Sequence, residues 1–163
     1  MHGVLFVSSW NFIFYEPLET AASSSELERV YLKLHETLKC LVPNIKVGLF
    51  IPFSFKGNRT GKSHQWILEH DVPLDFIGYE ANQNEAIDYE ELGEERFALV
   101  ANYLKEKTAR FKDLLRKYEK EKPLHLIGWN TLTGNTRFTN GNFFRGALVF
   151  KHALEFRNEF ESI

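Results

Sequence analysis

Glu16 is the residue that the sequence places best for acid–base chemistry. It follows the segment Val4–Tyr15, which is rich in β-branched and aromatic residues and is therefore predicted to be a strand that stops before Pro17. A carboxyl group beside rings such as Phe12 and Phe14 is desolvated, which raises its pKa and suits it to donate a proton near neutral pH. A Glu-Pro pair at a strand end also starts turns and helices, so this pattern leaves both interpretations open.

A second candidate site follows the segment Pro123–Asn130. Its apolar run, Leu124 to Ile127, predicts a parallel strand that is buried on both faces. Trp129 and Asn130 then stand at the carboxyl end of that strand, which is the end that carries the site in α/β architectures. The Trp129 ring can stack on a ligand there, or it can belong to the core.

The other common site chemistries lack their sequence patterns. Lys56–Ser63 looks like a phosphate-binding loop, but its first glycine is Gly57, one residue out of place, so we expect a polar loop. The six histidines show no metal-ligand spacing, and there is no nucleophile elbow around a serine. We therefore expect no metal, no cofactor and no nucleophilic Ser or Cys chemistry.

The composition limits the partners of the chain. A net charge of -2 and a pI near 6.3 give no reason to expect direct contact with nucleic acid or a membrane. Cys40 is the only cysteine, which fits a reducing compartment. The sequence therefore predicts one cytoplasmic domain over residues 1–163.

Strand-like and helix-like segments alternate along the chain. The expected strands are 4–15, 45–52, 74–79 and 123–129, and the expected helices are 23–42, 63–69, 88–120 and 142–160. Capping boxes at Ser23 and Asp88 support two of the helices. Four consecutive βα units predict an α/β fold with parallel strands, either a small open sheet or half of a barrel.

Several segments together resemble the glycoside hydrolases of family 39, the β-xylosidase and α-iduronidase family. The resembling segments are Phe14-Tyr-Glu-Pro17, Leu74–Asn82, Leu126-Ile-Gly-Trp-Asn-Thr131 and Thr139–Ala147, in the family's order. The resemblance implies a (β/α)8 barrel of which this chain holds strands four to seven, as a fragment of a longer polypeptide. It also implies that Glu16 occupies the acid/base position.

The departures from that family concern its catalytic residues. Retaining glycosidases need two carboxyl groups about 5–5.5 Å apart, but the nucleophile position is Gly128 here. Tyr15 replaces the asparagine before the acid/base, and Glu80 and Asn82 replace a histidine and a tyrosine. The chain is therefore expected to be inactive, although Glu80 could supply the missing carboxylate from the neighbouring strand.

Degenerate barrels of this kind resemble the C-terminal part of AraC-type transcriptional regulators of Gram-positive bacteria, and the segment Tyr79–Asn84 looks more like that group than like the enzymes. We therefore expect a non-catalytic carbohydrate-sensing or scaffold domain of such a regulator. The alternative is an active retaining β-glycosidase. The expected ligand contacts are Glu16, Tyr15, Tyr79, Glu80, Asn82, Trp129 and Asn130.

A half-barrel leaves two open sheet edges. Val4–Tyr15 and Pro123–Trp129 would be these edges, and neither carries a lysine or interior proline that discourages pairing. Self-association as a homodimer or larger oligomer would cover them, and we expect it.

Overall fold

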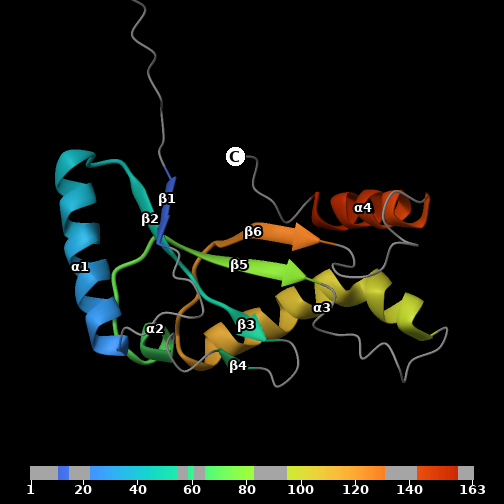
Figure 1. The fold of residues 1–163 in the computed structure, drawn as a ribbon, viewed down its shortest axis with the longest axis horizontal. Helices are drawn as coiled ribbons and strands as arrows, with labels where there is room; N and C mark the ends of the chain where they lie inside the picture. Colours follow the sequence, from blue (N-terminus) through green and yellow to red (C-terminus); the bar gives the residue numbers. More distant parts are fainter. Residues whose placement is uncertain are drawn as a thin grey trace, which may run out of the picture.

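The computed structural model describes residues 11–14, 23–54, 59–60, 65–82, 95–130 and 143–157, with the elements labelled in Figure 1. The strands are β1 (Asn11–Phe14), β2 (Lys46–Phe50), β3 (Phe53–Ser54), β4 (Arg59–Thr60), β5 (Phe76–Asn82) and β6 (Leu124–Asn130). The helices are α1 (Ser24–Leu41), α2 (Gln65–Glu69), α3 (Glu95–Lys117) and α4 (Phe143–Phe156). The predicted alternation of strands and helices is confirmed.

Four strands form one parallel sheet in the order β1-β2-β5-β6. The fold is therefore mixed α/β with a parallel sheet, as predicted. β3 and β4 form a separate antiparallel pair that joins Phe53 to Thr60 and Ser54 to Arg59. The prediction of a loop over residues 56–62 is wrong at residues 59 and 60, because backbone pairing with β3 gives this polar stretch extended structure.

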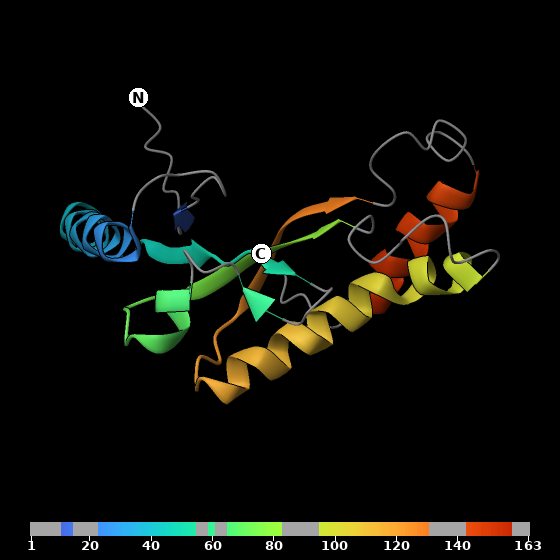
Figure 2. The ribbon, with the colours of Figure 1, turned by 60° about the horizontal axis from the view of Figure 1, so that its bottom comes forward.

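Helices α1, α2 and α3 pack on one face of the sheet (Figures 1 and 2). Their buried side chains include Tyr31 on α1, Trp66 on α2 and Phe111 on α3. They meet side chains of β2 and β5 that alternate along each strand, namely Val47, Leu49, Ile51, Ile77 and Tyr79. This alternation assigns one face of the sheet to the helices.

The opposite face carries three glycines in adjacent strands, Gly48, Gly78 and Gly128, and we call it the glycine face. A β-carbon on Gly48 would lie 2.5 Å from two ring atoms of Phe76 in the next strand. The Phe76 ring in turn stacks on His125 of β6, with the ring centroids 4.1 Å apart. Ile13 of β1 reaches over Gly78 in the same way. Side chains on this face therefore lie across glycines of other strands, Phe76 over adjacent β2 and Ile13 over β5, which is two strands from β1.

β6 lies at an edge of the sheet and is less buried than predicted. Leu124 and Leu126 pack against the helix-side core, but Ile127 on the other face is 40% exposed. The prediction of a strand buried on both faces is therefore wrong, because the helices cover one face of β6 and leave Ile127 on the glycine face partly exposed.

The first predicted capping box is confirmed at the start of α1. The Glu26 backbone N–H donates to the Ser23 hydroxyl over 3.4 Å, and the Ser23 N–H donates to the Glu26 carboxylate over 2.8 Å. The predicted cap at Asp88 lies outside the described residues. Within the described residues, no helix is both long and apolar enough to cross a membrane.

Asp75 ties the amino ends of β2 and β5 together. Its carboxylate accepts from the Val47 N–H over 2.8 Å and from the Lys39 ammonium over 2.7 Å, and Lys39 also donates to the Ile45 carbonyl. Burial by itself would raise the pKa of Asp75, but the bonds from Lys39 and Val47 outweigh burial and hold the pKa below its usual value. This carboxylate therefore joins α1, β2 and β5.

Gly48→Ala should destabilise the fold, whereas Gly146→Ala should stabilise it. The added methyl group meets the Phe76 ring in the first variant. In the second it meets nothing within 4 Å, because Gly146 is an exposed position of α4. Overpacking costs about 1–3 kcal/mol, while replacing a helical glycine by alanine gains about 0.8–1 kcal/mol. Urea unfolding followed by circular dichroism measures both changes, and equal effects would contradict the packing described here.

Asp75→Asn should lower stability at pH 7 by about 1–2 kcal/mol, a value reduced for the partial exposure of the pair. Because the folded-state pKa of Asp75 is depressed, its contribution is present above the unfolded pKa near 3.8 and is lost as the pH falls below it. The wild-type and Asp75→Asn unfolding curves should therefore converge below that pH. A difference that persists in acid would show that the charge is not responsible.

Candidate functional site

The carboxyl ends of β5 and β6 bring predicted site residues together. Glu80 is the register partner of Gly128, and Asn82 is the partner of Asn130. A register shift after Tyr79 produces this pairing, since Tyr79 pairs with Leu126 and Ile127 is skipped. Positions that are 48 residues apart in the sequence thus become neighbours at one end of the sheet.

The Glu80 side chain lies over Gly128 on the glycine face. A β-carbon on Gly128 would be 2.9 Å from Glu80 Cγ and 3.1 Å from both Cδ and Oε1. Glu80 is partly exposed. A carboxylate that only accepts hydrogen bonds therefore stands at the site end of the sheet, over the α-carbon of the predicted nucleophile position.

Tyr79 points to the opposite face and is 2% exposed. Its hydroxyl and the Thr108 hydroxyl are hydrogen-bonded over 2.7 Å, and Thr108 donates to the Leu104 carbonyl on α3. The Tyr79 ring also packs against Phe111, with centroids 5.6 Å apart. This placement corrects the prediction that Tyr79 contacts a ligand, because the residue joins β5 to α3 in the core.

Trp129 lies on the helix face too, beside the small cluster of Ala81, Tyr103 and Leu104. Its ring meets His152 of α4 edge to face, with centroids 5.5 Å apart and planes at 90°. The indole Nε1 is buried and has no hydrogen-bond partner within the described part of the chain. The core interpretation of Trp129 is therefore the one observed, and its ring lies on the other side of the sheet from Glu80.

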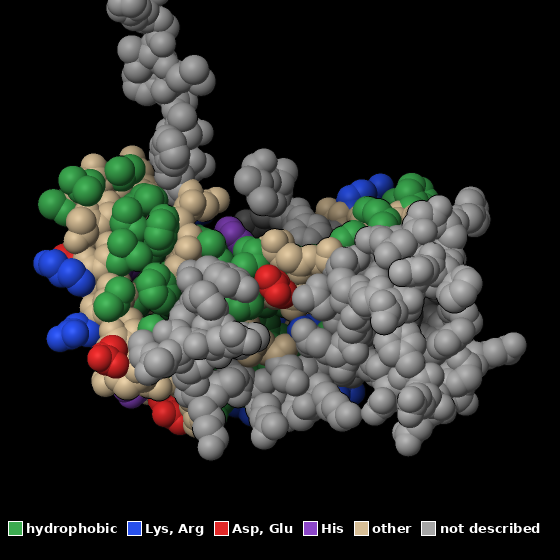
Figure 3. Space-filling model, in the orientation of Figure 1, with side chains coloured by type: hydrophobic (Ala, Val, Ile, Leu, Met, Phe, Trp, Pro, Cys, Tyr) green, Lys and Arg blue, Asp and Glu red, His purple; other side chains and the backbone are tan. Residues whose placement is uncertain are grey.

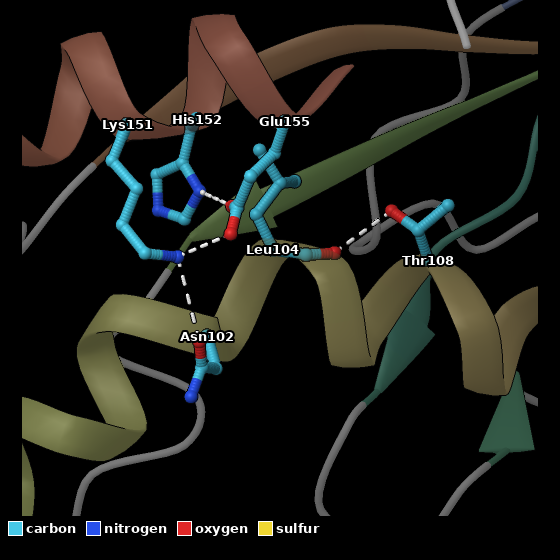
Figure 4. A network of polar contacts seen from close by, with 6 residues as sticks. All are labelled: Asn102, Leu104, Thr108, Lys151, His152 and Glu155. Carbon is cyan, nitrogen blue, oxygen red and sulfur yellow. Dashed lines mark hydrogen bonds and ion pairs between the residues drawn. The ribbon is translucent and has the colours of Figure 1, made fainter. Parts of the chain in front are cut away.

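His152 belongs to a polar network between α3 and α4 that is centred on Glu155 (Figure 4). Its Nδ1 lies 3.3 Å from Glu155 Oε2, and Lys151 contacts both Glu155 and, over 3.4 Å, the Asn102 side chain. His152 is 2% exposed. Burial lowers its pKa, and the hydrogen bond with Glu155 offsets part of that effect. The sequence held only a weak signal for this residue, its place one turn after Leu148 on the buried side of α4.

Two of the predicted site residues, Tyr15 and Glu16, lie outside the described residues, so their roles stay predictions. The backbone of Asn82 and Asn130 is described, and it places both at the strand ends. Among the described residues, no group of three or more His, Cys, Asp or Glu side chains could hold a metal ion. The Glu80 carboxylate, near the carboxyl end of β5, can accept hydrogen bonds there.

His152 should make stability fall as the pH drops from about 7.5 to 5.5. The pKa of His152 is lowered in the folded state. As the pH falls below the ordinary value near 6.5, the unfolded chain therefore binds a proton at His152 more readily than the folded chain does, and the free energy of unfolding decreases. His152→Gln should therefore reduce the shift of the urea midpoint between these two pH values. An unchanged shift in His152→Gln would contradict a lowered pKa of the buried His152 imidazole.

Comparison with known proteins found relatives among bacterial regulators. The chain is 30% identical over 138 residues to an uncharacterized HTH-type transcriptional regulator of Staphylococcus aureus strain MSSA476, and 30% identical over 133 residues to one of strain COL. These matches cover 84% and 81% of this chain but only 18% and 17% of the relatives. No family model matches the chain, and no solved structure gives a significant match.

The predicted link to transcriptional regulators is thus confirmed as sequence similarity. The resemblance to glycoside hydrolases of family 39 stays a prediction. The chain spans less than a fifth of the length of the curated relatives it matches, and it is similar to one segment of these HTH-type transcriptional regulators.

Proposed function

We propose that the chain is a non-catalytic carbohydrate-sensing or scaffold domain of a cytoplasmic AraC-type transcriptional regulator. The observation that carries the proposal is the similarity of 84% of the chain to segments of HTH-type regulators. In this proposal a separate module of the same polypeptide reads DNA, and this segment touches neither DNA nor membrane. The net charge of -2 agrees with that division.

The fold in this proposal is half of a (β/α)8 barrel, with strands four to seven. Three features support it: the main strands are all parallel, they follow one another across the sheet in chain order, and three helices pack on the same face. A closed barrel places its helices outside and its sites at the carboxyl ends of the strands. The glycine face would then be the barrel interior, and the Glu80–Gly128 end would be the mouth.

The ligand in this proposal is a sugar held at that mouth. Its polar contacts are Glu80, Asn82 and Asn130, together with Tyr15 and Glu16 as predicted from the sequence. A carboxylate and several amides match the hydroxyl groups of a sugar in kind. Tyr79 and Trp129 are not among the contacts, since they pack toward the helices.

Absence of catalysis follows from position 128. A retaining glycosidase needs two carboxyl groups about 5–5.5 Å apart, one as acid/base and one as nucleophile. Gly128, at the nucleophile position, has no side chain to attack an anomeric carbon. The alternative, an active retaining β-glycosidase, is favoured by one observation, the Glu80 carboxylate over Gly128. In that case Glu80 would be the nucleophile, supplied by the adjacent strand.

Sugar binding without hydrolysis is the expected result. Calorimetric titration with xylose and xylo-oligosaccharides should show binding at up to millimolar concentration, and aryl-xylosides should not be hydrolysed above background. Gly128→Glu should not create activity, because the new side chain would collide with Glu80. Turnover that Glu16→Gln abolishes would establish the glycosidase instead. Absence of binding by every sugar tested would leave only the scaffold role.

Self-association is expected through the strand edges. β1 and β6 are the two edge strands of the described sheet, and Ile127 on β6 is 40% exposed. Leaving a few hundred Å² of apolar surface in water forgoes stabilisation at about 25 cal/mol per Å². Pairing of two copies would recover that stabilisation, so light scattering should report a dimer or larger rather than 19.1 kDa.

Two variants separate the strand edge from the other exposed apolar surfaces. Exposed apolar side chains also lie on α1, where Figure 3 shows them gathered, and on α4, where Phe150 is 67% exposed. Ile127→Lys should yield monomers, because a lysine on an edge strand blocks pairing, whereas Phe150→Lys should not. A wild-type monomer at micromolar concentration, or dissociation by Phe150→Lys alone, would contradict assembly through the edges.

A further inference from the structure

Glu80 and Gly128 depend on each other because of the register shift between β5 and β6. Without the shift after Tyr79, the partner of Glu80 would be Ile127, whose side chain would need the same space. The shift places Gly128 there instead. Glu80 Cγ, Cδ and Oε1 all lie within 3.1 Å of the point where a β-carbon at position 128 would stand. A side chain at position 128 would therefore require the Glu80 side chain to shift.

The position of this carboxylate determines the ligands that it can accept. A carboxylate only accepts hydrogen bonds, and its two oxygens can accept from two hydroxyls on adjacent carbons of one ligand. Bonds to an ionised acceptor are roughly twice as strong as bonds between neutral groups. The same negative charge repels phosphate and carboxylate groups that approach the site. This repulsion would favour neutral ligands over anionic ones.

From this geometry we infer that Glu80, seated over Gly128, determines specificity at the site: it accepts hydrogen bonds from adjacent hydroxyls of a neutral sugar and rejects phosphorylated and acidic sugars. The inference rests on the proposed sugar-binding function and adds to it the class of sugar and the residue that selects it. It also assigns a role to Gly128, which leaves the space that the selecting carboxylate occupies.

The first test compares neutral and anionic sugars by calorimetry on the full chain. Xylose and glucose should bind, and glucuronate and glucose 6-phosphate should bind at least about tenfold more weakly. Glu80→Gln should weaken binding of the neutral sugars by about tenfold, as expected for loss of a charge-assisted hydrogen bond. It should also reduce the difference in affinity between neutral and anionic sugars. Glu36→Gln, an exposed carboxylate on α1, is the matched control and should change neither quantity.

The second test is a double-mutant cycle at the two positions. Gly128→Ala should weaken neutral-sugar binding when Glu80 is present, because the methyl group displaces the carboxylate. In a Glu80→Ala background the same change should have little further effect, which is the coupling expected of residues in contact. Thermal unfolding of each variant confirms that it is folded at the temperature of the titration.

The possible failures are distinct. If neutral sugars bind the wild type and Glu80→Gln binds them equally well, the assignment of Glu80 is overturned and the sugar-binding function stands. If Gly128→Ala acts equally with and without Glu80, the dependence between the two positions is overturned. If no neutral sugar binds the wild type, the sugar-sensing function fails, and this inference fails with it.

Discussion

Side chains approach glycines so closely on one face of the sheet that three positions there have no room for a β-carbon. Phe76 lies over Gly48, Ile13 over Gly78, and Glu80 over Gly128. Phe76 and Glu80 cross to an adjacent strand and Ile13 crosses past β2 to β5, so these side chains lie along the sheet rather than away from it. A methyl group at any of these glycines would lift its covering side chain. Two of these contacts are apolar and one is polar, and the polar one stands where the strands end.

The two ends of the sheet carry different kinds of interaction. At the amino ends, the Asp75 carboxylate accepts hydrogen bonds from Val47 and Lys39 and so joins α1, β2 and β5. At the carboxyl ends, Glu80 is partly exposed over a glycine. In parallel α/β folds, the amino ends serve stability and the carboxyl ends carry the sites. Asp75 and Glu80 follow that division.

Periodicity and local signals predicted most of the fold. Helical spacing and the Ser23 capping box gave α1, and the βα alternation gave the parallel sheet and its order. The short β3–β4 pair was missed, because it depends on a pairing partner for Arg59–Thr60 rather than on a local pattern. The edge position of β6 was predicted, but the exposure of Ile127 on that strand was not.

The residues of the predicted site lie at one end of the sheet, but their side chains do not all lie on one face. Glu80 and Gly128 were both singled out from the sequence, and the structure makes them partners. Tyr79 and Trp129 were expected to contact the ligand, yet both point to the helices. The register shift gives Trp129 this orientation because it pairs Trp129 with Ala81, whereas Tyr79 follows the regular alternation of β5. His152 was missed since its role arises only where α4 meets Trp129.

Chemical-shift mapping of a neutral sugar on the isotope-labelled chain locates the sugar site at the level of single residues. Xylose or glucose should shift the backbone amide signals of Glu80–Asn82 and Gly128–Asn130 together, and Glu80→Gln should reduce those shifts while signals around Asp75 stay unchanged. Shifts confined to other elements, or no shifts with any neutral sugar at millimolar concentration, would contradict a sugar site at the carboxyl ends of β5 and β6.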